Sequence, residues 1–338
     1  MPAVRASRLL RSAQPSLLRE LLGGDRDTRL VAGGAAAAAA VVLVGAGVSM
    51  TRTKQVDDSP GHVTMLSWNV LARPFTSYNQ RFHRANGKVE EPSQTRERYT
   101  LAGEEIARRA ADLVFLQEFE AGFLSPEWNL AAPKVTAGYE VFRCPQDLES
   151  GPGTAVLVKK AGTSVRVLDE RPICVGGTSE TGGRSKLATV VRVEAGAKRF
   201  AAVSAHFTWD GNAPQRLRHA ELLGAAIGDS SAVVAGDFNC EPGPHLAALE
   251  SSSFLGRMRR LELQPGATTG LTGDFSAEVC IDHVYVSADL GPAQASATAR
   301  PKKPWGGNVT RPAKVAGASD HVPISAVLVL EEQGAAAA

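Results

Sequence analysis

The sequence predicts an α/β fold in which two packed β-sheets are covered by helices on their outer faces. Runs rich in β-branched and apolar residues follow one another at 154–158, 164–168, 187–193 and 200–205. Elsewhere, two isolated segments carry apolar residues at helical spacing. Strands in series beside isolated helices indicate sheets that pack on each other, with the helices outside.

The two predicted helices span residues 92–111 and 212–228, and each has one apolar stripe for burial against a sheet. The stripes consist of Tyr99, Ala102, Ile106 and Ala110 in the first helix and Leu217, Ala220, Leu223 and Ile227 in the second. Asn212 is a suitable N-cap for the second helix, and Gly228 a suitable stop.

The run Gly236-Asp237-Phe238-Asn239 lies where a buried strand, residues 232–235, emerges from its sheet. Strand ends and the loops after them are where α/β proteins place their chemistry. Alternation along an extended chain points Asp237 and Asn239 to the same side. The carboxylate can act on a water or a metal ion, and the carboxamide can donate to a phosphate-like oxyanion.

Five further strand-like runs begin or end in similar residues. The runs cover 63–66, 113–116, 200–205, 279–281 and 322–330. Their polar neighbours are Trp68-Asn69, Gln117-Glu118, His206, Asp282-His283 and Ser319-Asp320-His321. A single Asp or Asn at a strand end is usually a turn former. Six strand ends with oxygen donors or imidazoles exceed what turn chemistry explains, so we expect one active site.

This ordered set resembles the endonuclease/exonuclease/phosphatase family of metal-dependent phosphodiesterases over residues 63–330. The motifs that narrow it are Ser67-Trp68-Asn69-Val70-Leu71-Ala72, Leu116-Gln117-Glu118-Phe119-Glu120 and His206-Phe207-Thr208-Trp209-Asp210 followed by Arg216. They resemble the deadenylase-type branch, which includes carbon catabolite repressor deadenylases, Angel and nocturnin. DNA-repair members usually carry Asp where this chain has Leu71, which argues against an abasic-site nuclease. The resemblance implies a four-layer α/β sandwich with two mostly antiparallel sheets.

The resemblance also implies a role for each motif residue. The implied metal ligands are Asn69, Glu118 and Asp320, and the implied catalytic residues are His206, Asp237, Asn239, Asp282 and His321. Asp237 would orient or deprotonate the attacking water, and Asn239 would hold the phosphate. His206 and His321 would supply positive charge or donors, with Asp282 orienting His321. Oxygen ligands suit Mg²⁺, with Mn²⁺ as the alternative, whereas a typical zinc site needs His or Cys.

Substrate contacts are expected from aromatic and basic residues near these motifs. The candidates are Trp209, Arg216, Trp305 and Asn308. The basic segment 300–314 surrounds Trp305, and such a segment can stack a base and neutralise its phosphate. A solvated helix face is the alternative for Arg216, and a Pro/Gly-rich connection without a ligand is the alternative for 300–314.

Charge bears on the substrate. Residues 1–58 hold eight of the 37 basic and five of the 35 acidic residues, so the remainder has 29 and 30 and a net charge of −1. A domain of this charge lacks the global positive field that dominates binding to long nucleic acids. The resemblance to the deadenylase-type branch nevertheless implies a 3′–5′ exoribonuclease of poly(A)-specific type. The alternative is a phosphatase or phosphodiesterase on a small nucleotide or dinucleotide phosphate, and a third hypothesis is an inactive nucleotide-binding module.

The first 58 residues are typical of a targeting segment. Arg5, Arg8 and Arg11 recur among small and apolar residues, as in an organellar presequence. Residues 30–50 carry no charge and could span a bilayer, although an Ala/Gly-rich tract of a cleaved leader has the same composition. We expect a catalytic domain over 59–332 and a disordered tail over 333–338. We expect mitochondrial localisation, with a plastid or an endomembrane anchor as the alternatives.

The remaining features concern partners and thiols. The chain has no leucine-rich docking repeat, and we expect a monomer that binds RNA or a nucleotide phosphate and, through the N-terminal segment, a membrane. The four cysteines, Cys144, Cys174, Cys240 and Cys280, form no C-x-x-C pair. Two disulfides are compatible with the count, but a domain of this length does not require them, so we expect free buried thiols.

Overall fold

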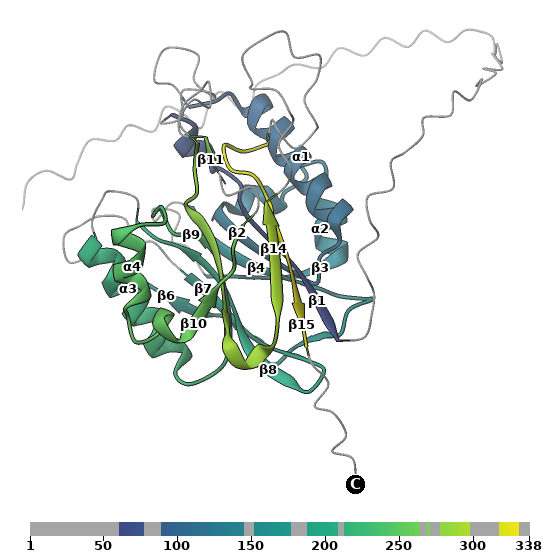
Figure 1. The fold of residues 1–338 in the computed structure, drawn as a ribbon. Coiled ribbons are helices and arrows are strands. Elements are labelled where there is room, and N and C mark those ends of the chain that lie inside the picture. Colours follow the sequence, from purple (N-terminus) through teal and green to yellow (C-terminus); the bar gives the residue numbers. More distant parts are fainter. Residues whose placement is uncertain are drawn as a thin grey trace, which may run out of the picture. The chain divides into compact units, whose positions relative to one another are not determined.

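The computed structural model describes residues 61–77, 89–144, 152–176, 188–208, 213–263, 269–270, 278–297 and 318–330. All of them belong to the unit Lys54–Ala338. In this unit two β-sheets pack face to face, and a pair of helices covers the outer face of each sheet (Figure 1). The predicted α/β sandwich with two mostly antiparallel sheets is therefore confirmed.

The first sheet has six strands in the order β14-β15-β1-β2-β4-β3. They are β1 (His62–Asn69), β2 (Leu113–Phe119), β3 (Tyr139–Arg143), β4 (Gly153–Lys159), β14 (Ala293–Ala297) and β15 (Ile324–Val329). Only β1 and β2 are parallel to each other; the other neighbours in this sheet are antiparallel.

The second sheet has seven strands in the order β10-β13-β9-β8-β7-β5, and β6 also pairs with β7. They are β5 (Val165–Val167), β6 (Ile173–Val175), β7 (Ala188–Ala195), β8 (Lys198–His206), β9 (Ala232–Asp237), β10 (Met258–Arg260) and β13 (Asp282–Ser287). This sheet too has one parallel pair, β8 and β9. A separate two-stranded sheet joins β11 (Thr269–Gly270) to β12 (Glu278–Val279).

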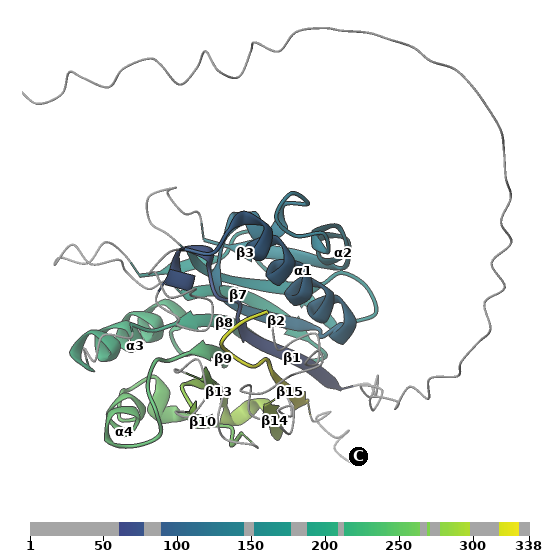
Figure 2. The same cartoon turned by 90° about the horizontal axis from the view of Figure 1, so that it is seen from above.

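Three apolar layers hold the sandwich together. Between the sheets, Met65 and Phe115 of the first sheet share a core with Val233 and Val286 of the second. On the outer faces, α1 (Pro92–Arg109) and α2 (Ala132–Gly138) cover the first sheet, while α3 (Ala213–Ile227) and α4 (Pro244–Glu250) cover the second (Figure 2). The short 3₁₀ helices are η1 (Arg73–Ser77), η2 (Ala121–Leu124), η3 (Leu255–Arg257) and η4 (Ala288–Leu290). Burial on both faces explains why the central strands have continuous apolar runs.

The predicted helices are confirmed, with one correction at the end of α1. Tyr99, Ala102 and Ile106 are buried against the first sheet as their spacing predicts. Ala110 is exposed, because α1 ends at Arg109 and Ala110 adopts a left-handed φ of 50° as the C-cap. At the end of α3, Gly228 has a φ of +65° and its N–H donates to Gly224 O at 2.8 Å, so it stops the helix as predicted.

Two further expectations are wrong. Asp282 and His283 do not end a strand but begin β13, which runs antiparallel to β9 and pairs Asp282 with Asp237. The start of β13 therefore lies at the same edge of the sheet as the end of β9. Cys144 and Cys174 form a disulfide, with Cα atoms 5.5 Å apart, while Cys240 and Cys280 are free. The disulfide joins segments after β3 and within β6 that sequence spacing does not place together.

Several expectations concern residues outside the described ranges. These are the targeting segment 1–58 with its hydrophobic stretch 30–50, Trp209, Trp305, Asn308, the segment 300–314 and the tail 333–338. Among the helices of the described residues, none is long and apolar enough to cross a membrane.

Candidate active site

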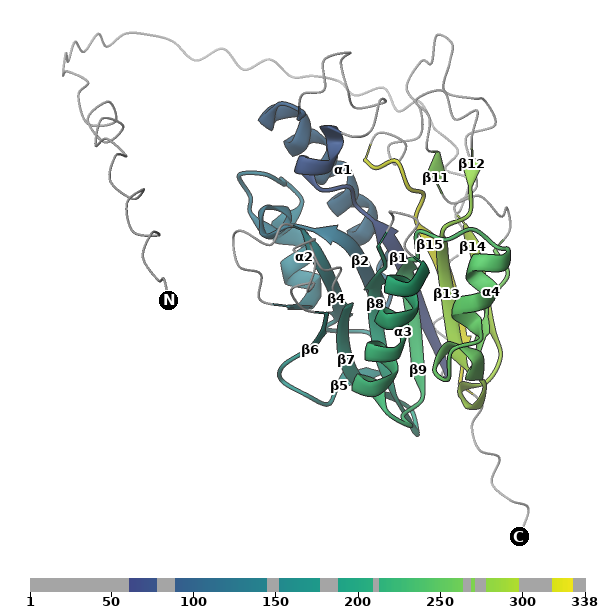
Figure 3. The ribbon, with the colours of Figure 1, turned by 90° about the vertical axis from the view of Figure 1, so that its left-hand side faces the viewer.

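The site forms at one edge of the sandwich, where the parallel pair of each sheet ends. In the first sheet Asn69 of β1 lies beside Gln117 of β2, and in the second sheet His206 of β8 lies beside Asp237 of β9. Figure 3 shows these four strands side by side between the helix pairs. The carboxyl ends of parallel strands meet at the same edge of a sheet, which places the polar residues after them together.

Glu118 is held by hydrogen bonds from both sides of its carboxylate. Asn69 Nδ2 donates to Oε1 at 3.0 Å, and the backbone N–H of Ala72 donates to Oε2 at 2.9 Å. Its φ of 54° lies in the left-handed region, and the β2–β4 register shifts between Gln117 and Phe119. Such a break re-aims a side chain at a strand end, here into the space between the sheets.

Asn69 connects the two halves of the site. Its Nδ2 donates to Glu118 in the first sheet and to Asp237 Oδ2 in the second, each at 3.0 Å. Its Oδ1 accepts the N–H of Leu71 at 3.0 Å, and Leu71 has a φ of 52°. Asn69 is completely buried, so its orientation is set by these three partners.

Asp237 is the most crowded carboxylate of the site. Its Oδ1 accepts the N–H of Asn239 at 2.8 Å, and Oδ2 lies 3.4 Å from His206 Nε2 and 3.7 Å from His321 Nε2. Burial raises the pKa of Asp237 to about 7, and nearby Asp282 acts in the same direction, whereas the charge of His321 opposes the shift. A carboxyl that titrates near neutrality can exchange a proton with a water at neutral pH.

His321 and Asp282 form a buried pair across the two sheets. His321 Nδ1 donates to Asp282 Oδ2 at 2.8 Å. Burial lowers the pKa of His321, but the negative charges of Asp282, Asp320 and Asp237 outweigh burial and hold it well above its usual value. His321 is therefore a cation at neutral pH, locked in orientation by Asp282.

The neighbouring histidine has the opposite character. His283 follows Asp282 in β13 and points to the other face of the strand, where its ring packs edge-on against Phe238. Its Nε2 lies 2.8 Å from the carbonyl oxygen of Cys240. Burial lowers the pKa of His283 to about 4, so it is neutral.

Asn239 is positioned by backbone contacts. Its Nδ2 donates to Phe207 O at 2.9 Å, and its φ is 48°. The guanidinium of Arg216, from α3, donates to Thr208 O at 3.2 Å and to Asn239 O at 3.4 Å. Arg216 is 4% exposed, so the structure places it beneath Asn239; its contact with a substrate stays a prediction.

Gly236 explains how closely β8 and β9 approach at this point. It has a φ of +155°, and a Cβ atom there would lie 1.9 Å from the carbonyl oxygen of Ala205. Only glycine fits this position. The close approach brings His206 and Asp237 side by side at the ends of their strands.

The donor set fits a divalent cation. Glu118, His206 and Asp237 offer ligand atoms within 4.8 Å of one another, and so do Asp237, Asp282 and His321. Because His321 is protonated, the second group is better suited to proton chemistry. Asp320 lies beside it, with Oδ1 at 3.2 Å from Ser319 Oγ and 4.0 Å from His321 Nε2. Carboxylate oxygens are the ligands that Mg²⁺ and Mn²⁺ prefer.

The structure brings together all eight predicted ligands and catalytic residues, from Asn69 to His321. Trp209, Trp305 and Asn308 lie outside the described ranges. The sequence analysis assigned no role to Trp68, Arg98 or Ser319, which hold the backbone behind the site. Trp68 and Ser319 are next to motif residues in the sequence, and this proximity could have indicated a role at the site. No sequence pattern indicates a role for Arg98, because its partners Val70 and Ala318 are distant in the sequence.

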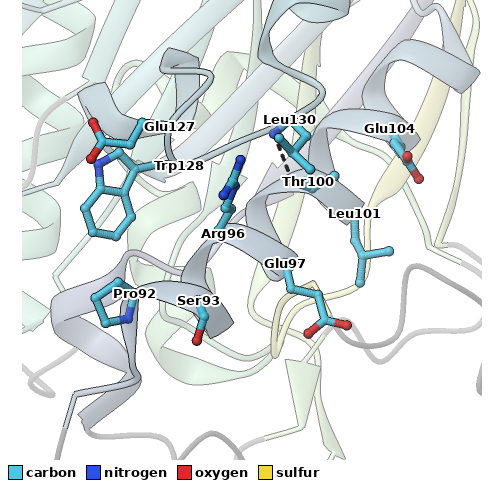
Figure 4. Close-up of a pocket in the computed structure, with 10 residues that line it drawn as sticks. All are labelled: Pro92, Ser93, Arg96, Glu97, Thr100, Leu101, Glu104, Glu127, Trp128 and Leu130. Carbon is cyan, nitrogen blue, oxygen red and sulfur yellow. Dashed lines mark hydrogen bonds between the residues drawn. The ribbon is translucent and has the colours of Figure 1, made fainter. Parts of the chain in front are cut away.

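A separate open groove lies on the outer face of α1 (Figure 4). Trp128, Leu101 and Leu130 line it together with three glutamates, Glu97, Glu104 and Glu127, and one arginine, Arg96. None of its lining residues belongs to the active site. Its excess of acidic residues is unfavourable for a phosphate backbone.

Comparison with known proteins identifies the family. Residues 66–321 match the sequence profile described as Endonuclease/Exonuclease/phosphatase family. The chain belongs to this family. Its members are metal-dependent phosphoric ester hydrolases, and the described residues of this chain include a cluster of carboxylates and histidines that could hold a metal ion. No curated protein matches the chain in sequence.

Solved structures of the family share the fold at low sequence identity. An endonuclease/exonuclease/phosphatase from Bacteroides vulgatus is 17% identical, with a TM-score of 0.56 over 80% of this chain and 99% of that one. Truncated TDP2 from Caenorhabditis elegans is 15% identical, with a TM-score of 0.55 over 79% and 97% of the chains. D. rerio TDP2 in complex with a single-strand DNA product is also 15% identical, with a TM-score of 0.54 over 79% and 98%.

Proposed function

We propose that the protein is a Mg²⁺-dependent phosphodiesterase that hydrolyses single-stranded RNA from the 3′ end and prefers adenylate tracts. Hydrolysis of a phosphodiester is supported by one observation: Glu118, Asn69 and Asp237 lie next to the His321 cation. The RNA and adenylate preference rests on the resemblance of the motifs around Asn69, Glu118 and His206 to the deadenylase-type branch.

Glu118, with Asn69 and Asp320 beside it, would hold the metal ion. When bound, a divalent ion supplies positive charge to a phosphate oxygen and so stabilises the charge that develops on phosphorus. Asn69 now donates its amide N–H groups to Glu118 and Asp237, so its oxygen reaches a metal only after the amide rotates. Without rotation, the same amide keeps the two carboxylates at a fixed spacing.

The chain's own residues account for the proton chemistry. Asp237, with its pKa near 7, orients the attacking water and accepts its proton. Nε2 of His206 and Nε2 of the His321 cation lie 3.4 and 3.7 Å from Asp237 Oδ2. Both rings would therefore lie next to the negative charge that develops on the phosphate in the transition state. Asn239 offers its remaining amide N–H to the phosphate while the other is held by Phe207 O.

A small nucleotide phosphate is the second candidate substrate. The net charge of −1 over residues 59–338 favours it, because a polymer substrate is usually bound by an extensive positive surface. The D. rerio TDP2 structure contains a single-strand DNA product, which supports a polymer in a related fold at 15% identity. The two candidates differ in how binding should respond to salt.

A substrate panel separates the candidates. Purified protein is incubated with Mg²⁺ or Mn²⁺ and labelled poly(A), mixed-sequence RNA or NADP⁺, and the Glu118→Ala protein is the control in each reaction. Shortening of poly(A) from the 3′ end with steep salt dependence supports the proposal. Phosphate release from NADP⁺ alone supports the second candidate. If neither metal supports hydrolysis of any phosphoester by the intact protein, the proposal is wrong.

We further propose that residues 1–58 are an address and that chemistry resides in 59–332. The Arg-rich start and the Ala/Gly tract of residues 1–58 differ in composition from the chain after Val63. A protein that begins at Ser59 should fold and keep its metal-dependent activity. A reporter fused to residues 1–58 should go to mitochondria, and alkaline carbonate extraction distinguishes a spanning anchor from a cleaved leader. A diffuse cytosolic reporter would contradict the proposal.

A further inference from the structure

The two segments that carry Asn69 and Asp320 extend beyond the β1–β15 ladder that joins them, although Asn69 still pairs with Gln117 of β2 on its other side. β1 and β15 pair from His62↔Val329 to Ser67↔Ile324, and the ladder ends there. Asn69 lies two residues beyond the last pair on one chain segment, and Asp320 and His321 precede the last pair on the other. The predicted metal ligands therefore stand on backbone that has no β-ladder between the two segments.

Two side chains of these segments join them directly. Ser319 Oγ donates to Asn69 O at 2.6 Å, and Trp68 Nε1 donates to His321 O at 3.0 Å. Each bond satisfies a buried carbonyl that the ladder no longer reaches. The third connection comes from outside both segments.

Arg98, on the inner face of α1, bonds to both segments through one nitrogen. Its Nη1 donates to Val70 O at 2.8 Å and to Ala318 O at 3.1 Å. Val70 follows Asn69 directly, and Ala318 precedes Ser319. Arg98 is 3% exposed, so its charged guanidinium is buried where the two segments meet.

Glu90 compensates the buried charge of Arg98. Its carboxylate accepts from Arg98 Nε at 3.1 Å and also from Nη2, and its own N–H donates to Thr76 Oγ1 at 3.0 Å. A buried charge is tolerated when it is paired and hydrogen-bonded. The pair fixes the guanidinium plane, because Glu90 takes Nε and Nη2 and leaves Nη1 directed at the carbonyls.

We propose that Arg98 is a positioning residue that sets the spacing of the predicted metal ligands Asn69 and Asp320 through Val70 O and Ala318 O. The inference rests on the metal-dependent hydrolysis proposed above. The Glu90 carboxylate bonds to the guanidinium, and the Glu90 backbone bonds to Arg73 and Thr76 of η1, beyond Val70, whereas Arg98 bonds to Val70 O and Ala318 O themselves. The two residues of the pair therefore have separable effects: Glu90 acts on stability, and Arg98 acts on stability and on the geometry of the metal site.

The experiment compares variants that divide these effects. Glu90→Gln keeps one acceptor oxygen for Nε and Nη2 of Arg98, so the guanidinium can keep its orientation, but it removes the compensating charge. Arg98→Lys keeps the charge but has one nitrogen in place of the planar fork, so it does not serve Glu90 and both carbonyls together. The double variant Glu90→Met/Arg98→Met removes both charges and replaces them with apolar volume, which often restores stability. Arg109→Met is the matched control, because Arg109 is also on α1, paired with Glu105 and bonded to Ser325 of β15, away from the site.

Each variant is measured by urea unfolding, by Mn²⁺ affinity from the paramagnetic signal of free Mn²⁺, and by kcat and KM. We expect Arg98→Lys and the double variant to lose about 10- to 100-fold in Mn²⁺ affinity and in kcat, as for other groups that orient metal ligands. KM for the substrate should change less than kcat. Glu90→Gln should unfold at lower urea but bind Mn²⁺ nearly as the wild type does, and Arg109→Met should leave Mn²⁺ affinity unchanged.

Two results would overturn the inference: a folded double variant with wild-type Mn²⁺ affinity and kcat, or a Glu90→Gln protein that loses as much Mn²⁺ affinity as Arg98→Lys. The second would mean that the pair is structural only. The Mn²⁺ measurement also separates this inference from the proposed function. If the wild type binds Mn²⁺ and hydrolyses nothing while Arg98→Lys binds Mn²⁺ more weakly, then the function is wrong and the positioning role stands.

Discussion

The two parallel strand pairs end at the same edge of the sandwich but deliver different chemistry. At the end of β1 and β2, the Glu118 carboxylate accepts hydrogen bonds from two neutral donors, the amide of Asn69 and the backbone N–H of Ala72. At the end of β8 and β9, Asp237 is surrounded by titratable groups, with His206, His321 and Asp282 close to it. Neutral donors keep a carboxylate charged and available to a cation, whereas coupled acids and bases allow protons to move.

This difference indicates a division of labour between the sheets. In the proposed mechanism, the first sheet would hold the metal ion, and the second would supply the group that takes a proton from water. Asn69, bonded to both Glu118 and Asp237, sets the distance between them. If the division is right, metal affinity and pH dependence should respond to different substitutions.

Substitution on the first side should have the largest effect. Glu118→Ala removes the central metal ligand, and we expect kcat to fall about 10³-fold or more, since a bound metal contributes several kcal/mol of charge stabilisation. Mn²⁺ affinity should fall with it. Any residual activity should keep the wild-type pH dependence, because His321 is untouched. Glu127→Ala, at an exposed glutamate of the groove on α1, is the control. Unchanged Mn²⁺ affinity in Glu118→Ala would show that the end of β1 and β2 does not bind the metal ion, and the proposed difference between the two strand pairs would be wrong.

Substitution behind His321 should change the pH profile. In Asp282→Asn the largest favourable charge beside His321 is lost, so the raised pKa of His321 falls. Because the cation is the active form, the alkaline limb of the kcat profile should move to lower pH, and kcat should drop about 10²-fold or more at neutral pH. Mn²⁺ affinity should stay close to the wild-type value.

The neighbouring residue provides the matched control for Asp282→Asn. His283→Gln alters the same strand at a neutral histidine that faces the helices, so the alkaline limb should stay in place even if stability falls. An identical shift in both variants would show that the limb reports folding and not the ionisation of His321.

The smallest expected effect is on the stability of the metal-free protein. The pKa of Asp237 is about 7 in the folded state and 3.8 in the unfolded chain, so the folded state binds the proton more tightly. Ionisation of Asp237 therefore lowers stability as pH rises from about 4 to about 7. Asp237→Asn should remove this part of the pH dependence and be more stable than wild type above pH 7, by a few kcal/mol at most.

Urea unfolding in EDTA at pH 4 to 8 checks this prediction, and the two proteins should converge at the acid end. Added Mn²⁺ should stabilise both proteins, because Asp237→Asn leaves the proposed metal ligands Asn69, Glu118 and Asp320 in place. A stability difference that is the same at every pH would mean that folding does not raise the pKa of Asp237, and the contrast with Glu118 would lose its basis.

The sequence was sufficient for the two long helices, for the central strands and for the strand ends of the candidate site, but not for the short helices α2 and α4 or the strands β3, β6, β10 and β14. Apolar runs followed by polar residues placed Asn69, Glu118, His206 and Asp237 at strand ends, because strand periodicity and strand length are local properties. The position of Asp282 was wrong in detail, since residues 278–279 belong to a separate hairpin and β13 begins at Asp282 itself. Pairing direction is a long-range property that a local pattern does not contain.

Long-range contacts account for what the sequence did not reveal. Arg98 bonds to Ala318, 220 residues away, and an arginine on a helix is by default a solvated residue. Cys144 follows β3 of the first sheet and Cys174 lies in β6 of the second, so the pair is brought together only by the tertiary fold. Arg216 is a further example of contacts that a local pattern does not contain. The sequence suggested a substrate contact, whereas in the structure its guanidinium donates to the backbone carbonyls of Thr208 and Asn239.

Four residues other than glycine have a left-handed φ among the described residues, and three of them, Leu71, Glu118 and Asn239, belong to the site. Such a backbone costs about 1–2 kcal/mol per residue, and glycine relieves it. Laboratory evolution for heat resistance alone would therefore favour glycine at position 118, and in doing so would delete the carboxylate. Selection of this chain has to be for turnover and heat resistance together, because at these positions the two requirements oppose each other.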